Sequence, residues 1–486
     1  MSVLLTKTLF LISALALSSA AAELHIGAAR IDTTPDKTVA LAGQFKTRLS
    51  KNVQTPLTAT AVAIEAREGG KTGDQAILLS CDLIGFYPKV VEAVRTRLRE
   101  KLPEFDPRKL VLTATHTHTT PITEENFYTL PPEGVMPRGA YTAILADRLS
   151  DVCTNAWKQR VPGGVSWGLG HALIGVNRRT VDASGEAKMY GDTQSPDFRN
   201  IEGEGDDGLE LLFFWDSQKR LLATAVNVAC PAQVLEHSTS IHADFWHDVR
   251  EQLDKGLVLG WPGACGDLSP HWMTRKSAEL RMLKLRGLTP TGDIGRRIAR
   301  EVNEVRELTR SDIRTNTVFA HTIATITLPL RQVTERDVAA AKKAIEALKQ
   351  KKPNSPQIGA FQKTIDRFTK PDASQTLSVD VHILRIGDIA ISTNPFELFH
   401  DYGTQIKARS KADQTFVLEL TDGFLSYLPT QRAVDAGGYS ALAGDNRVGP
   451  DGGQILVNRT VERINSLWPE TNAPASHGPP PLKDGP

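Results

Sequence analysis

Residues 110–121 read LVLTATHTHTTP, and the rest of the chain can be interpreted outward from this stretch. It opens with alternating apolar residues, the pattern of a buried strand, and then delivers His116 and His118 just before a Thr-Thr-Pro turn. Side chains two positions apart on an extended chain point to the same face, so both imidazoles are expected in one pocket. Such a pair suits a metal ligand beside an acid/base partner. The alternative is two polar strand-end residues hydrogen-bonded to loop backbone.

The segment before this stretch predicts a crossover unit. Ala76–Leu83 has the pattern of a strand, and Tyr87–Leu102 has apolar residues at helical spacing before Pro103 ends the helix. A strand, a helix and a second strand in this order predict two parallel strands. The histidines would then lie at the carboxyl end of a strand, where open α/β sheets usually place their chemistry.

The remaining pattern predicts an α/β fold of mixed sheets with flanking helices, in one continuous domain. Residues 182–207 are polar and rich in Gly and Asp, and predict a long surface loop. Two charged, Ala-rich segments separated by Pro353 and Pro356 predict a helical hairpin, inserted at 333–370 and pointing outward. Further helices are expected at 140–157, 244–257, 292–308 and 399–410, strands at 25–35, 58–66, 164–169, 258–261, 318–330 and 415–420, and hairpins at 209–228 and 378–393.

The two ends of the chain differ from this body, which spans 23–471. Residues 1–22 have a Lys7-containing start, an apolar run at Leu9–Leu17 and an Ala20-x-Ala22 site, which predicts a signal peptide cleaved before Glu23. The protein is therefore expected to be exported, to a periplasm or the extracellular medium. No later stretch is apolar enough to cross a membrane. The Pro- and Gly-rich residues 472–486 predict a disordered tail.

Charge and cysteine content exclude several classes of protein. The chain has 57 basic and 56 acidic residues and no basic run, which argues against a surface that binds nucleic acid or an anionic membrane. Its four cysteines are too few for a disulfide framework in 486 residues. Composition alone therefore indicates a globular protein without a polyanionic partner.

Three further turns carry polar groups that could form a site. Cys230-Pro231 precedes a loop rich in histidine, which is as often solvated surface as a functional site. Residues 263–270 read GACGDLSP, where Asp267 and Ser269 share a face if extended; Ser269 could be a nucleophile or a helix cap. Glu397 follows the strand 389–392 and could be a metal ligand or an acid in the first turn of a helix.

Taken together and in order, these motifs resemble the amino-terminal catalytic domain of the neutral (non-lysosomal) ceramidases. The resemblance runs from Gly27 to about Leu442. Its motifs are GAARIDTTP at 27–35, HTH at 116–118, NR at 177–178, GDLSP at 266–270, PFE at 395–397, SYLPT at 426–430 and GY at 438–439. Each motif is short, but the ordered set is specific.

The resemblance implies a zinc-dependent hydrolase that cleaves an N-acyl amide bond. His116, Glu397 and Tyr427 fall on the family's zinc ligands and Ser269 on its catalytic serine, within a turn that also contains Asp267. His118, Arg178 and Tyr439 fall on residues that hold the scissile amide. Zinc would polarise the carbonyl or lower the pKa of bound water to about 7. Ser269 would attack the carbonyl or position it, and His118 would pass a proton to the leaving amine.

The chain departs from the family pattern at two points. Where the family has a second histidine ligand before a proline, this chain has Cys230, whose thiolate is a good zinc ligand. The alternative is that His242 supplies this ligand. The chain also stops soon after the catalytic region, so the additional carboxyl-terminal β-sandwich domain of characterised ceramidases is expected to be missing.

Three hypotheses therefore stay open. The first is a zinc-dependent enzyme acting on ceramide-like lipids or other N-acylated amines, with transient contact to a membrane surface. The second, motivated by Cys230, is a metal-poor relative that binds such a ligand without cleaving it. The third, motivated by the missing domain, is a zinc hydrolase of an ester or a non-lipid amide.

Overall fold

The computed structural model describes residues 21–123, 128–131, 133–137, 139–351, 357–372 and 374–468. The predicted signal peptide therefore lies almost entirely outside the described residues, as does the predicted tail at 472–486. Within the described part, no helix combines the length and the apolar character needed to span a bilayer.

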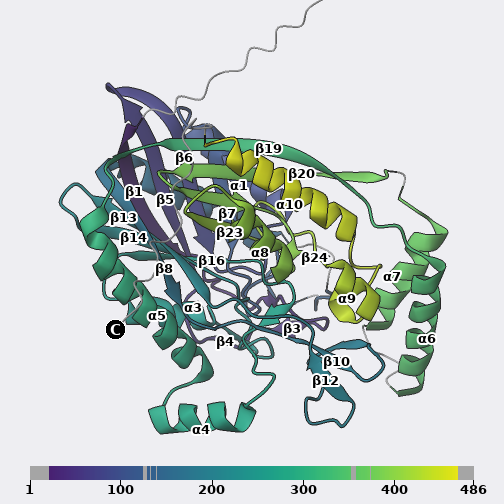
Figure 1. Cartoon of the computed structure of the whole chain (residues 1–486). Helices are drawn as coiled ribbons and strands as arrows, with labels where there is room; N and C mark the ends of the chain where they lie inside the picture. The colour runs from purple at the N-terminus through teal and green to yellow at the C-terminus, as the bar shows by residue number, and fades with distance from the viewer. Residues whose placement is uncertain are drawn as a thin grey trace, which may run out of the picture.

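A large mixed sheet occupies the left side of the molecule in the view of Figure 1. Its strand order is β16 (Leu257–Pro262), β14 (Leu221–Val228), β13 (Gly208–Asp216), β8 (Val161–His171), β1 (Ala22–Asp32), β5 (Thr58–Glu68), β6 (Lys71–Cys81) and β7 (Leu110–Ala114), with β18 (Asn316–Thr317) pairing to β1. The inner pairs are antiparallel, whereas the pairs β6–β7 and β14–β16 at the two ends are parallel. Each parallel pair is joined through a helix, α1 (Pro88–Lys101) or α3 (Phe245–Gln252), as parallel strands require.

The expected crossover unit is therefore confirmed, with α1 between β6 and β7. The apolar side of α1 packs with α2 (Ala140–Lys158) on one face of the sheet, and α3 packs with α5 (Pro290–Thr309) on another part of it.

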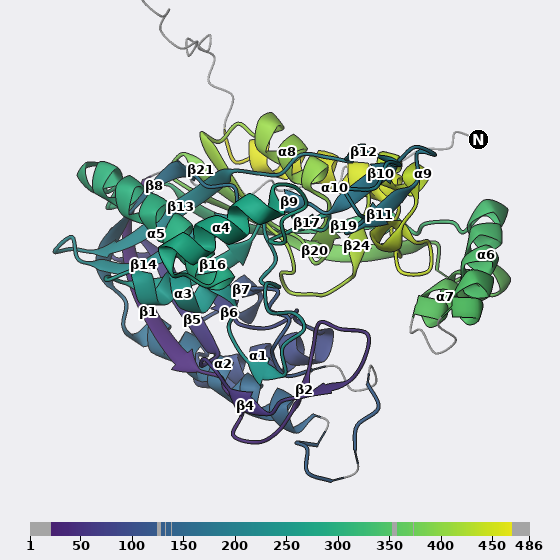
Figure 2. The ribbon, with the colours of Figure 1, turned by 90° about the horizontal axis from the view of Figure 1, so that it is seen from below.

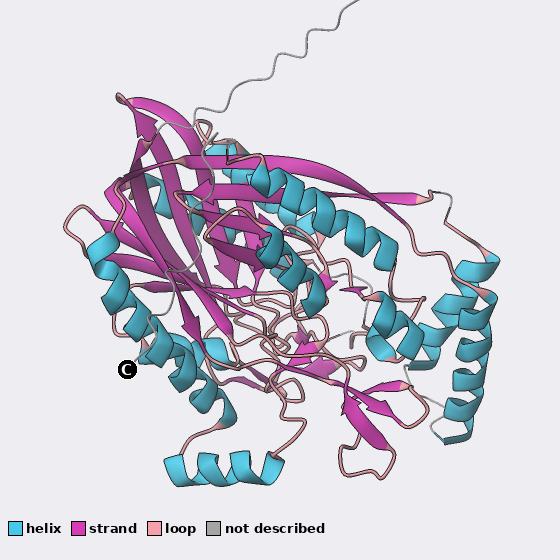
Figure 3. Ribbon diagram, viewed as in Figure 1, coloured by secondary structure: helices cyan, strands magenta, loops and turns pink. Residues whose placement is uncertain are grey.

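A second, four-stranded sheet packs against the large one through a shared apolar core. Its order is β19 (Phe319–Pro329), β20 (Thr376–Ile386), β21 (Ile389–Thr393) and β23 (Gln414–Leu418). Helices α8 (His400–Arg409) and α10 (Pro450–Asn465) cover its outer side. Two sheets thus lie between helices, and Figure 3 shows the connecting loops gathered in the middle of the molecule.

The predicted helical hairpin is present as α6 (Glu335–Lys351) and α7 (Gln357–Thr369), which stand away from the sheets (Figure 2). Its two prolines at 353 and 356 lie outside the described residues. Three other helices were not predicted: α4 (Lys276–Arg286), α9 (Gln431–Ala436) and α10.

Two expectations need correction. The supposed loop 182–207 contains β11 (Ala187–Met189) and β12 (Phe198–Ile201), which pair with β10 (Arg179–Asp182) in a small sheet. The polar side chains of this stretch mask the apolar alternation from which a strand is predicted. The Asp182 carboxylate accepts hydrogen bonds from the backbone N–H groups of Ser184 and Glu186, in the tight turn between β10 and β11. Helix α3 ends at Gln252 rather than 257, because Leu253 is already extended and Gly256 adopts a left-handed φ of 73°.

Candidate functional site

His116 and His118 lie side by side, but for a different reason than predicted. Strand β7 ends at Ala114, and His116 has a left-handed φ of 58°, so the pair is not extended. The backbone N–H groups of Thr115 and Thr117 instead donate to the carbonyls of the last residue of β6, Cys81, and of Leu83 just after it. The two rings are nearly perpendicular with centroids 4.8 Å apart. The two rings are thus brought side by side by this kinked loop rather than by an extended strand.

The hydrogen bonds of the two histidines define their tautomers. His116 Nδ1 lies 2.7 Å from the Ile84 carbonyl oxygen, and His118 Nδ1 lies 3.0 Å from that of Gly43. A carbonyl only accepts, so both Nδ1 atoms carry a proton, and in a neutral ring Nε2 is then the acceptor. His118 Nε2 is buried and has no hydrogen-bond partner among the described residues.

The environment of His118 keeps it neutral. Burial, reinforced by the nearby charges of His116 and Arg178, holds the pKa of His118 well below its usual range. Gly43 is necessary here, since it has a φ of 90° and a Cβ would stand 2.5 Å from the His118 ring. His118 therefore presents a fixed, unprotonated nitrogen to the interior.

Glu397 and Tyr427 come together on two short parallel strands, β22 (Glu397–Leu398) and β24 (Tyr427–Leu428), where they are paired in register. Glu397 Oε1 lies 3.4 Å from His116 Nε2. Burial, together with the Glu397 charge, raises the pKa of the Tyr427 phenol well above its usual range. Tyr439 packs edge-on against Tyr427 with ring centroids 5.6 Å apart. Three of the predicted metal ligands, His116, Glu397 and Tyr427, thus lie together in the protein interior.

Arg178 connects this group to the serine turn. Its Nη2 donates to the Tyr427 hydroxyl at 3.1 Å and to the Gly266 carbonyl at 2.9 Å. Its Nε is buried and has no hydrogen-bond partner within the described chain. The backbone N–H of Gly266 in turn donates to Leu398, and a Cβ at Gly266 would stand 2.3 Å from the Glu397 carbonyl oxygen. Only glycine allows these two segments to approach so closely.

Ser269 is fully buried and belongs to β17 (Leu268–Ser269), which pairs with β9 (Val176–Asn177) beside Arg178. Its Oγ accepts hydrogen bonds from the His271 backbone N–H at 3.1 Å and from Gln233 Nε2 at 3.2 Å. The Tyr190 hydroxyl lies 2.9 Å away. Among the described residues no histidine or carboxylate side chain contacts this oxygen, so the base of a conventional nucleophile–base pair does not touch it.

Asp267 has a structural position rather than one facing the reacting groups. Its two carboxylate oxygens accept hydrogen bonds from Asn177 Nδ2 and from the His400 backbone N–H, both at 2.8 Å. Burial raises the pKa of this carboxyl. Asp267 thus holds the serine turn to β9 and to the start of α8.

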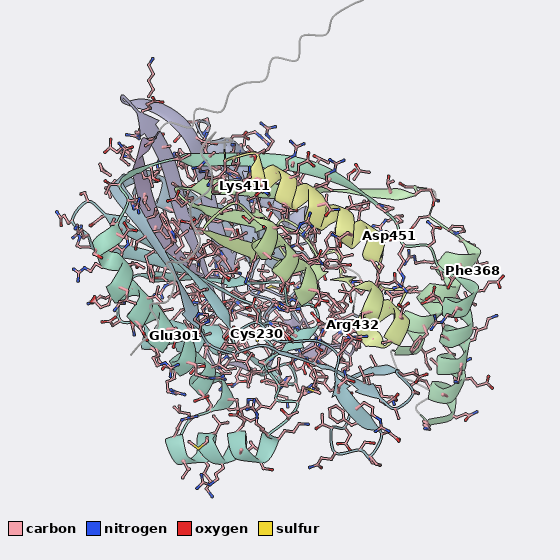
Figure 4. The ribbon with its side chains drawn as sticks, viewed as in Figure 1. Cys230, Glu301, Phe368, Lys411, Arg432 and Asp451 are labelled. Atoms are coloured by element: carbon pink, nitrogen blue, oxygen red, sulfur yellow. The ribbon has the colours of Figure 1, made fainter. Side chains whose placement is uncertain are left out.

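Cys230 and His242 are not brought to the other ligands. Cys230 follows β14 in the interior (Figure 4) and belongs to an apolar cluster with residues of α3 and α5. Burial raises the pKa of its thiol well above the usual range, which favours the protonated form. His242 Nδ1 accepts the Asp244 backbone N–H at 2.8 Å, and its ring packs against His247. Neither side chain contacts His116, Glu397 or Tyr427 in the described structure.

The residues present fit a zinc ion in part. Two ligands in tetrahedral coordination with bonds of about 2.1 Å lie roughly 3.4 Å apart, which matches His116 Nε2 and Glu397 Oε1. The Nδ1–H bond of His116 to a carbonyl is the usual support of a metal-binding imidazole. The described residues contain no group of three His, Cys, Asp or Glu side chains able to hold a metal ion, and the side chain that lies beside Glu397 is the Tyr427 phenol.

Four residues of the site were missed by the sequence reading. Gln233 and Tyr190 contact Ser269, while Glu236 lies 3.4 Å from His271 Nε2 and 3.8 Å from His118 Nδ1. His271 and Gln233 stand close to quoted motifs and could have been found by extending them. Tyr190 carried no signal, because it lies in the segment interpreted as a surface loop.

Comparison with known proteins finds similarity in structure but not in sequence. No family model matches the chain, and no curated protein matches it significantly in sequence. A solved structure of a ceramidase complexed with C2 superposes with a TM-score of 0.65 at 16% identity, covering 94% of this chain and 77% of the other. Neutral ceramidase from Pseudomonas aeruginosa gives a TM-score of 0.64 at 17% identity over the same shares. The chain therefore has the ceramidase fold.

Proposed function

We propose that this protein, with its ceramidase fold, is an exported zinc-dependent enzyme that hydrolyses an N-acyl amide of the ceramide type. One observation carries the proposal: among the described residues, a buried acceptor, His118 Nε2, and a buried donor, Arg178 Nε, both lack a hydrogen-bond partner, and the Arg178 charge acts on the pKa of His118. Hydrolysis of an amide needs an acceptor for the proton of the attacking group and a donor for the oxygen that gains negative charge. Export is supported by the character of residues 1–22 alone.

Zinc would be held by His116, Glu397 and Tyr427, which lie together in the interior. Bound there, it would supply Lewis acidity, polarising the carbonyl or easing deprotonation of water. The other residues have roles of their own.

His118 is neutral and its Nδ1–H is fixed by Gly43, so its Nε2 can accept a proton and later return it to the leaving amine. Arg178 is anchored by Tyr427 and Gly266, so its free Nε–H can donate to the carbonyl oxygen. Ser269 either attacks the carbonyl or positions it, held in both cases by two N–H donors.

The test combines a substrate panel with metal analysis. Purified protein is assayed on a short-chain ceramide, on an ester of the same acyl chain and on a non-lipid N-acyl amide. Zinc per chain is measured for the wild type, His116→Ala and Cys230→Ala. We expect ceramide hydrolysis, about one zinc in the wild type and in Cys230→Ala, and loss of zinc in His116→Ala.

The same panel includes His118→Ala, which should keep its zinc and lose activity by about 100-fold or more. Hydrolysis of the ester or the non-lipid amide alone would replace the proposed substrate. Full activity of His118→Ala would contradict the assignment of the proton acceptor.

A second candidate function is ligand binding without catalysis, and the position of Cys230 favours it. The thiol lies in an apolar cluster, so only three of the four ligand positions in the family pattern, those of His116, Glu397 and Tyr427, would be filled. This candidate predicts substoichiometric zinc together with measurable binding of a short-chain ceramide. Turnover of any acyl amide would rule it out.

A further inference from the structure

Helix α4 (Lys276–Arg286) follows the serine turn directly and stands away from the body of the molecule. Figure 1 shows it projecting below α5, and Figure 2 shows the same helix from below. Leu283 is its single buried side chain. Three large apolar side chains are exposed instead: Leu280 (59%), Leu285 (63%) and Met282 (36%). Leu283 is thus the side chain that packs α4 against the body, and the three exposed apolar side chains do not contribute to this packing.

The same helix concentrates positive charge. Arg275, Lys276, Arg281 and Lys284 are exposed, and none of them forms an ion pair in the part of the chain that the structure describes. Arg286 differs, because it pairs with Asp293 at 3.2 Å. The whole chain has a net charge of only +1, so this cluster is a local feature rather than a general property.

The helical repeat places two of the three exposed apolar residues next to basic residues on the outer side. Met282 and Leu285 are three residues apart and lie on the side turned away from Leu283. Arg281 and Lys284 border this side, and Leu280 lies beyond Lys284. Long basic side chains can extend around an apolar face to reach anionic groups beside it.

We propose that α4 docks the protein on an anionic lipid bilayer, with its outer side in the headgroup region. Docked in this way, Met282 and Leu285 would enter the boundary between headgroups and acyl chains, and Arg281 and Lys284 beside them would meet lipid phosphates. Charge complementarity favours a bilayer over a second copy, because α4 would meet another cluster of its own sign in a symmetric pair. Docking here would hold the Ser269 turn, seven residues before Lys276, close to the lipid surface.

Co-sedimentation with vesicles tests this proposal without any measurement of hydrolysis. The wild type is incubated with vesicles of phosphatidylglycerol and phosphatidylcholine, and with vesicles of phosphatidylcholine alone. We expect binding to the anionic vesicles that weakens as salt is raised. Arg281→Gln/Lys284→Gln should weaken it about 30-fold, since each basic residue near such a surface contributes about fivefold.

The apolar contribution is tested by Met282→Gln/Leu285→Gln, which should weaken binding at least about tenfold. Glutamine is a good helix former, so α4 should persist in both variants, which circular dichroism and thermal unfolding can verify. Matched controls are Lys342→Gln/Lys343→Gln in α6, which removes the same charge, and Leu308→Gln in α5, which removes another exposed leucine (70%). Both should bind like the wild type.

Two outcomes would overturn the proposal. One is equal loss of binding in the control variants, or no binding of the wild type to anionic vesicles. The other is a concentration-dependent dimer, seen by light scattering, that is lost in Met282→Gln/Leu285→Gln while vesicle binding is absent. That result would assign the face to a second copy of the chain. Neither result would change the hydrolysis of ceramide in solution. Failure of the membrane-docking proposal can therefore be distinguished from failure of the proposed function.

Discussion

The buried ion pair between Arg179 and Glu202 makes the sharpest prediction about stability. Their side chains are 0% and 2% exposed, and the guanidinium donates two hydrogen bonds to the carboxylate, at 2.6 and 3.0 Å. Arg179 also donates to the carbonyl of Ala433 within α9 (Gln431–Ala436) and to that of Gly437, the residue after the helix. Glu202→Ala would leave the guanidinium buried without its counter-charge. Breaking a buried pair in this way costs about 3–5 kcal/mol, a large part of the about 5–15 kcal/mol that stabilises a typical domain.

Urea unfolding of Glu202→Ala, Arg179→Met and the double variant Arg179→Met/Glu202→Leu measures this cost. We expect each single variant to lose about 3–5 kcal/mol and the double variant to lose clearly less than the sum, by about 2 kcal/mol or more. Activity should fall with Glu202→Ala too, because Arg179 Nη1 donates to Ser440, next to Tyr439. A loss below about 1 kcal/mol in Glu202→Ala, or strict additivity, would refute the reasoning.

Two further predictions concern His242 and Gly43. Burial lowers the pKa of His242 from 6.5 to about 4, so between these values the unfolded chain binds more protons and stability falls as the pH falls. His242→Asn, whose Oδ1 can still accept the Asp244 N–H, should remove up to about 3 kcal/mol of this acid sensitivity in urea unfolding at pH 7 and 4.5; an unchanged pH dependence would contradict it. Gly43→Ala should lower ceramide hydrolysis at least about tenfold, because a Cβ at φ 90° would push against the His118 ring. Wild-type activity in that variant would show that the position of His118 is not critical.

Much of the fold could be predicted from local pattern. The helix predicted at 87–102 is α1 (Pro88–Lys101), and the hairpin predicted at 209–228 is β13 with β14. These segments have clear apolar periodicity and a physical stop, such as Pro103 after α1. Helix α4 escaped prediction because only Leu283 is buried, so its apolar residues do not follow one face.

Those residues of the candidate site that belong to short sequence motifs could be predicted, but their contacts with other segments could not. Four of the predicted residues do come together: His116, Glu397, Tyr427 and Arg178. Ser269 lies on β17, which pairs with β9 directly before Arg178. The contacts of Ser269 with Tyr190 and Gln233 depend on the packing of segments that are remote in sequence, and no local pattern encodes them. The backbone at His116 illustrates the same limit, because its positive φ arises from hydrogen bonds between the loop and the chain at and just after the end of β6.

The assembly of the site from distant segments has a consequence for how the protein matures. Gly43, His116, Arg178 and Glu397 lie on segments far apart in the sequence, and Tyr427 comes from one of the last segments of the body. Non-local contacts of this kind form late, after local helices and hairpins. With the proposed ligands, the chain could not capture its ion during synthesis, and a chain cut short before Tyr427 would be inert. Metal uptake would then act as a quality check, reporting that nearly the entire polypeptide had reached its native arrangement.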